Sequence, residues 1–107
     1  MGPWTGLDPG SFDDPTQKAP LIIYVNQDMD LLAEYRDKLT AKRLSENTIQ
    51  ARINKYTTHI AFHLYQMHLK KREMEKHPGD DVFTDDQMRD EIQRVSRTLI
   101  ELMEVSQ

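Results

Sequence analysis

The stretch "RLSENTIQARI", residues 43–53, specifies the start of a helix. Ser45 is a residue type favoured at the N-cap, where its hydroxyl accepts a hydrogen bond from the backbone N–H of Thr48. Leu44 and Ile49 flank this cap and can form a hydrophobic staple, which fixes the angle at which the chain enters the helix. We therefore expect a short, rigid turn here that joins two helices into a hairpin.

Apolar residues recur at helical spacing on both sides of this turn and again near the C-terminus. The spacing predicts helices at about residues 27–43, 46–76 and 85–105. Asn26 or Asp28 would cap the first helix, and Thr84 with Gln87 would form a capping box before the third. The predicted fold class is all-α: a three-helix bundle with a long central helix.

The first twenty residues contain three of the four glycines and four of the five prolines. Because this segment has few apolar side chains to offset the entropy cost of ordering, we predict a disordered tail over residues 1–19 and a single helical domain over residues 20–107. An apolar arm at 21–25 has clear strand propensity, but a lone strand is not stable. It would pack on the helices as an extended arm, pair with another chain, or form the first helical turn. We favour the first of these.

Charge is unevenly distributed along the chain, whose net charge is −4. Residues 36–77 hold ten Lys or Arg and four acids, a net charge of +6, whereas the segments on either side are acidic. A basic centre could contact a polyanion, or the acidic segments could neutralise it within the fold. There is no cysteine, no apolar run of the ~20 residues that a membrane span needs, and no secretory signal, so we expect a cytoplasmic protein.

Two groups of basic and polar residues could contact phosphates. Small polar side chains at a helix N-terminus, as in the first group, can contact phosphates or base edges. The first group surrounds the predicted turn between the first two helices and comprises Lys38, Lys42, Arg43, Ser45, Asn47, Thr48, Arg52 and Lys55. The second group ends the central helix and comprises Lys70, Lys71, Arg72 and Lys76.

No residues point to catalysis. His59 and His63 are one helical turn apart and could share a metal, but no carboxylate lies near them on the helix, so we interpret them as polar groups at the edge of the core. A nucleophile elbow, a phosphate-binding glycine loop and an EF-hand loop are all missing from the sequence. We predict a protein that is not an enzyme, with no metal site, no cofactor and no small-molecule substrate.

A stretch of 35 residues follows the pattern of a known family. An apolar helix with Leu31, Leu32, Tyr35 and Leu39 is followed by an "LSxxTI" motif at residues 44–49 and by a second amphipathic helix. Residues 31–65 thereby resemble the core-binding (SAM-like) N-terminal domain of tyrosine recombinases, the phage integrase family. The catalytic domain of that family, with its arginines and its tyrosine nucleophile, has no counterpart here. The resemblance implies a helical module that clamps DNA without cleaving it.

Two functions follow from these observations. The first is a DNA-binding accessory protein that contacts duplex DNA through the basic centre. The alternative is a protein–protein interaction or homo-oligomerisation module, in which a central helix of ~45 Å extends beyond its shorter neighbours and a second subunit or another helical protein covers the excess. Phe62, Tyr65 and Leu69 make the flanks of the central helix apolar, so this part is expected to lie between two neighbours.

Overall fold

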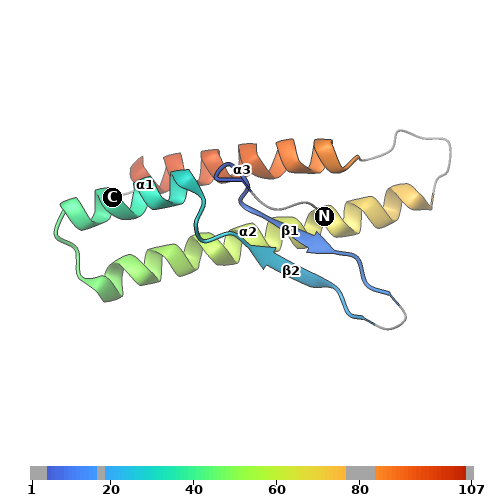
Figure 1. Cartoon of the computed structure of the whole chain (residues 1–107), viewed down its shortest axis with the longest axis horizontal. Coiled ribbons are helices and arrows are strands. Elements are labelled where there is room, and N and C mark those ends of the chain that lie inside the picture. Colours follow the sequence, from blue (N-terminus) through green and yellow to red (C-terminus); the bar gives the residue numbers. More distant parts are fainter. Residues whose placement is uncertain (1–4, 17–18, 77–83, 106–107) are drawn as a thin grey trace.

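The computed structural model describes residues 5–16, 19–76 and 84–105. Its elements are, in chain order, β1 (Gly10–Asp13), β2 (Ile22–Val25), α1 (Asp30–Ala41), α2 (Glu46–Glu75) and α3 (Asp85–Val105). Helices α1 and α3 lie along one side of α2, and the hairpin of β1 and β2 packs against the C-terminal half of α2 (Figure 1). The molecule measures 52 × 28 × 23 Å, because the 30 residues of α2 span its length.

The three predicted helices are present, but the hairpin shows that the fold is not all-α. β1 and β2 pair antiparallel, with Gly10 opposite Val25 and Asp13 opposite Ile22. The predicted arm does pack on the helices, as β2, yet its partner strand comes from the segment assigned to a disordered tail. Residues 5–16 therefore belong to the folded body, whereas residues 1–4, 17 and 18 of the predicted tail lie outside the described residues.

One buried side chain and one close backbone approach hold β1 in place. Phe12 is 7% exposed, and its ring forms a T-shaped pair with the His68 ring at a centroid distance of 5.6 Å. Nδ1 of His68 lies 3.1 Å from the Asp14 carboxylate, just beyond the strand. A Cβ at Gly10 would collide with the carbonyl oxygen of Tyr24, so the strand pairing requires glycine there. These contacts are with residues far along the chain, so the strand propensity of the segment itself does not predict them.

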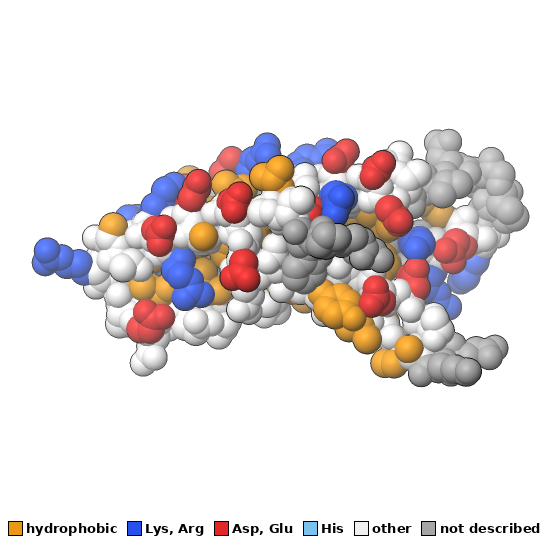
Figure 2. All heavy atoms as spheres, in the orientation of Figure 1, with side chains coloured by type: hydrophobic (Ala, Val, Ile, Leu, Met, Phe, Trp, Pro, Cys, Tyr) orange, Lys and Arg blue, Asp and Glu red, His pale blue; other side chains and the backbone are white. Residues whose placement is uncertain are grey.

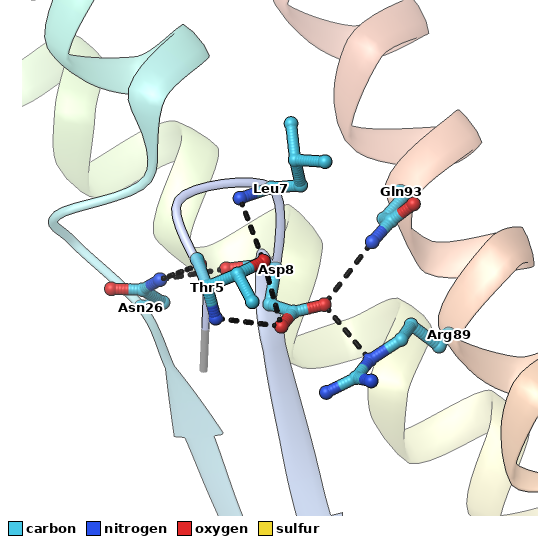
Figure 3. Close-up of polar contacts among 6 residues, drawn as sticks. All are labelled: Thr5, Leu7, Asp8, Asn26, Arg89 and Gln93. Carbon is cyan, nitrogen blue, oxygen red and sulfur yellow. Dashed lines mark hydrogen bonds and ion pairs between the residues drawn. The ribbon is translucent and has the colours of Figure 1, made fainter. Parts of the chain in front are cut away.

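Asp8 joins the loop before β1 to the rest of the molecule (Figure 3). Its side chain is 3% exposed and accepts hydrogen bonds from the backbone N–H of Thr5 at 2.9 Å and from Nε2 of Gln93 at 3.1 Å. Nε of Arg89 lies 3.0 Å from the same carboxylate. The side-chain amide of Asn26 donates to the backbone carbonyl of Asp8 at 2.8 Å. A single loop thus contacts α3 and the end of β2 at once.

Helix α1 begins later than the predicted 27–43. The side-chain oxygen of Asn26 accepts a hydrogen bond from the backbone N–H of Asp28 at 3.0 Å, which closes a turn in front of the helix. The helix then begins at Asp30, and its N-cap is Met29, which makes no side-chain capping bond. The prediction of an N-cap at Asn26 or Asp28 was therefore wrong, because the turn competes with the cap for the same side chain.

Helix α1 also ends earlier than predicted, at Ala41. Arg43 has a φ of 60°, the left-handed conformation. Its N–H bonds to the carbonyl of Thr40 at 2.9 Å, and the N–H of Leu44 bonds to the carbonyl of Leu39 at 3.4 Å. This pair of bonds is the Schellman motif, which usually has glycine at the left-handed position. The turn before α2 is therefore specified on both sides, by this motif and by the cap that follows.

The predicted starts of the other two helices are confirmed. Oγ of Ser45 accepts the backbone N–H of Thr48 at 3.2 Å, and α2 begins directly after it. Thr84 and Gln87 make the reciprocal bonds of a capping box, at 3.1 and 3.0 Å, before α3. α2 ends one residue before the predicted position, at Glu75, and α3 has the predicted bounds.

The core lies between α2 and its two helical neighbours. The predicted apolar stripe of α2 is buried in full, at Ile49, Ile53, Tyr56, Ile60, Leu64 and Met67. The Tyr56 hydroxyl lies 2.6 Å from Oγ of Ser96 on α3, and that oxygen lies 3.4 Å from Sδ of Met29 before α1. Burial raises the pKa of Tyr56 to about 12. This cluster of Tyr56, Ser96 and Met29 joins three segments through buried groups that satisfy one another.

Arg43→Gly is expected to stabilise the protein by about 1 kcal/mol, because a left-handed conformation is strained for every residue with a Cβ. The measurement is the urea midpoint of unfolding. Lys42→Gly is the matched control: Lys42 has a φ of −80°, so glycine there should lower the midpoint. An Arg43→Gly midpoint at or below that of the wild type would contradict the Schellman geometry.

Asp8→Asn should destabilise the protein by about 1–3 kcal/mol near neutral pH, since it removes a buried charged acceptor. Burial alone would raise the pKa of Asp8, but the hydrogen bonds from Thr5 and Gln93 and the charge of Arg89 together hold it below its ordinary value of 3.8. The stabilisation is therefore present above that value and is lost as the pH falls through the lower pKa of the folded state.

The difference in unfolding free energy between wild type and Asp8→Asn should accordingly shrink below about pH 4. Asp37→Asn, which changes an exposed carboxylate of α1, is the control and should show little difference at any pH. A difference that stays constant down to about pH 2 would show that the charge of Asp8 does not matter.

Candidate functional site

Two of the predicted contact residues form ion pairs with acidic segments of the same chain. Nζ of Lys38 donates to the Glu104 carboxylate at 2.9 Å, and Nζ of Lys71 donates to the Asp14 carboxylate at 2.6 Å. These hydrogen bonds raise the pKa of both amines. The acidic ends of the chain therefore neutralise part of the basic centre within the fold, as one of the two expectations proposed.

The polar residues of the first group mainly build the turn between α1 and α2. Oγ of Ser45 caps α2 and also lies 2.9 Å from Oγ1 of Thr48, so both hydroxyls serve the helix start. Lys42 and Arg43 are exposed within the turn itself, and Asn47 is exposed in the first turn of α2. Lys38, Ser45, Thr48 and Lys55 of this group are exposed as well.

The remaining predicted cations follow one another along α2 and do not close around the turn. Arg52 is partly buried, whereas exposed side chains are found at Lys55, Lys70, Arg72 and Lys76. Positions 55 and 72 are 17 residues apart, or about 26 Å along a straight helix. Only part of each predicted group therefore lies on α2, and the two parts remain at opposite ends of the helix.

The side of α2 that faces away from the core carries an ordered row of exposed residues. Positions spaced alternately by three and four residues share one side of a helix. We call this row the α2 outer face, and it consists of Lys55, Thr58, Phe62, Tyr65, Leu69, Arg72 and Lys76. Phe62 is 56% exposed, Tyr65 43% and Leu69 45%. This part of the helix does lie between two neighbours, α3 and the hairpin, but both cover other sides of it and leave the three apolar side chains exposed.

Negative charge is missing from most of α2. From Asn47 to Arg72 the helix contains 26 residues without an Asp or Glu. The first acid beyond this stretch is Glu73, which lies 3.9 Å from Lys76. On the face of the molecule drawn in Figure 2, by contrast, basic and acidic side chains alternate over α1 and α3. Helix α2, which carries the outer face, thus has a smaller proportion of acidic residues than α1 or α3 has.

A groove of about 510 Å³ between β1, α2 and α3 carries an excess of negative charge, unlike the α2 outer face. Its floor includes apolar side chains such as Leu64 and Ile92. Two cations, Lys71 and Arg89, line it together with five carboxylates, those of Asp8, Asp13, Asp14, Asp85 and Asp86. This excess of negative charge repels phosphates, so the groove does not extend the basic surface.

The three histidines that the structure describes do not converge on a metal site. His59 is exposed and His63 is partly buried, and His68 is directed to Asp14. Within residues 5–16, 19–76 and 84–105, no three His, Asp or Glu side chains are placed to hold a metal ion. The same described residues contain no helix that is both long and apolar enough to cross a membrane.

Comparison of the chain with protein-family models, with curated proteins and with solved structures finds no match. The resemblance of residues 31–65 to the core-binding domain of tyrosine recombinases therefore stays a prediction. Sequence reasoning located the cations of the candidate surface, but it did not identify Phe62 and Tyr65 as exposed. The spacing of 55, 58, 62, 65, 69, 72 and 76 was the signal that could have revealed them.

Proposed function

We propose that the protein is a non-catalytic nucleic-acid-binding module that contacts phosphates through the α2 outer face. The observation that carries this proposal is the run of 26 residues without an acid on α2, whose exposed side bears Lys55 and Arg72. Cations that approach a phosphate chain release its condensed counterions, which drives binding without any base contact. Because α2 is a continuous helix, it presents these cations in a fixed row.

The surroundings of the outer face support the same function. Lys42, Arg43 and Asn47 are exposed at the turn that precedes it, and Lys70 is exposed on its flank. The chain has a net charge of −4, and the groove between β1, α2 and α3 repels a nucleic acid through its excess of carboxylates. The resemblance of residues 31–65 to a domain that clamps DNA supports the same class of ligand.

The test is a titration of labelled duplex DNA at several salt concentrations, read by fluorescence anisotropy. The affinity should fall steeply with salt, and the double variant Lys55→Gln/Arg72→Gln should lower the slope of log K against log salt by about two, since each phosphate contact contributes roughly 0.9. Lys38→Gln/Arg97→Gln changes the net charge equally on α1 and α3, and is expected to leave the slope almost unchanged.

Two results would contradict the proposal. Absence of binding to any nucleic acid at ~50 mM salt would remove the function altogether, because phosphate contacts are strongest at low ionic strength. Equal loss of affinity in the two double variants would show that binding follows net charge and that α2 is not the contact surface.

A protein-interaction module is the second candidate, favoured by the exposure of Phe62, Tyr65 and Leu69 on one helix face. Ile22 and Tyr24 of β2 are each 39% exposed, and Figure 2 shows hydrophobic side chains gathered over the hairpin. Exposed apolar groups of this kind often mark a surface that another chain covers. Light scattering distinguishes this candidate, because it predicts a stable dimer that Leu69→Ala weakens.

A further inference from the structure

Two exposed aromatic rings lie between the cations of the α2 outer face. Phe62 and Tyr65 are neighbours on the helix surface at a spacing of three residues, and they are 56% and 43% exposed. The Phe62 and His63 rings form a T-shaped pair, with a centroid distance of 6.4 Å and an interplanar angle of 68°. In this position the apolar surface of both rings is in contact with water, and a bound ligand could bury it.

The cations lie symmetrically about this pair of rings. Lys55 precedes Phe62 by seven residues and Arg72 follows Tyr65 by seven, so each cation lies about 10 Å from a ring along the helix axis. A duplex encloses the faces of its bases and offers an aromatic side chain only phosphates and groove edges. Unpaired bases have free faces, which stack on aromatic side chains while the backbone phosphates contact Lys and Arg.

We propose that the α2 outer face binds single-stranded nucleic acid, with bases stacked on Phe62 and Tyr65 and phosphates held by Lys55 and Arg72. The proposal rests on the proposed function and names its ligand. Charge complementarity to a polyanion selects this occupant over a second copy, because the outer face of every copy carries the same excess of positive charge. From Lys55 to Lys76 the face extends about 32 Å along the helix, so it is long enough to contact several consecutive nucleotides of a single strand.

The experiment compares an oligothymidylate of about 15 nucleotides, within the site sizes of single-strand binders, with a duplex of the same length. The wild type should bind the single strand at least tenfold more tightly. Phe62→Ala/Tyr65→Ala should lose roughly tenfold or more for each ring on the single strand and should change duplex binding little. Leu102→Ala removes an exposed apolar side chain from α3, outside the outer face, and should alter both affinities less than threefold.

Each possible result decides between the proposals. If Phe62→Ala/Tyr65→Ala binds the single strand as the wild type does, while Lys55→Gln/Arg72→Gln weakens it, the stacking inference is overturned and the proposed function stands. If no nucleic acid binds, both are overturned. If the wild type is a dimer that both Leu69→Ala and the double aromatic variant dissociate, the outer face is a protein interface. The ring proton shifts of Phe62 on addition of oligothymidylate give an independent readout, and stacking requires them to move upfield.

Discussion

The arrangement of the helices depends on the buried contact between Tyr56, Ser96 and Met29, where α2, α3 and the segment before α1 meet. The Tyr56 and Ser96 hydroxyls have each other as partners only when α2 and α3 are in register, and an unpaired buried hydroxyl would cost about 1–3 kcal/mol. The cluster lies on one side of α2. It thereby keeps both shorter helices on that side and leaves the opposite side of α2 to solvent.

The acidic ends of the chain fold back onto its basic residues, and the resulting pairs determine which cations remain for a ligand. Asp14 accepts from Lys71, and Glu104 accepts from Lys38. Exposed pairs of this kind contribute little to stability, but they remove cations from the surface available to phosphates. Lys55 and Arg72 of the α2 outer face lie within the acid-free run of the longest element, whereas Lys76 lies beyond that run and pairs with Glu73.

Local rules predicted the helices well, because staples, caps and apolar spacing act within a few residues of the chain. They missed β1, whose sequence "GSFD" contains two residue types depleted in strands and is stabilised by contacts of Phe12 and Gly10 with residues far along the chain. The same limit applies to the candidate site. The cations were predicted from charge, but their partners are 66 residues distant for Lys38 and 57 for Lys71, a separation that no local pattern encodes.

The position of β1 has a consequence for the order in which the protein folds. The strand precedes the other elements that the structure describes, yet its buried contacts are with β2 and with residues of α2 more than fifty positions later. A growing chain must therefore keep this segment free of other partners until most of α2 has left the ribosome. Long-range pairing of this kind also slows folding, because a large loop must close before its contacts form. The earliest residues of the body are thus among the last to reach their native environment.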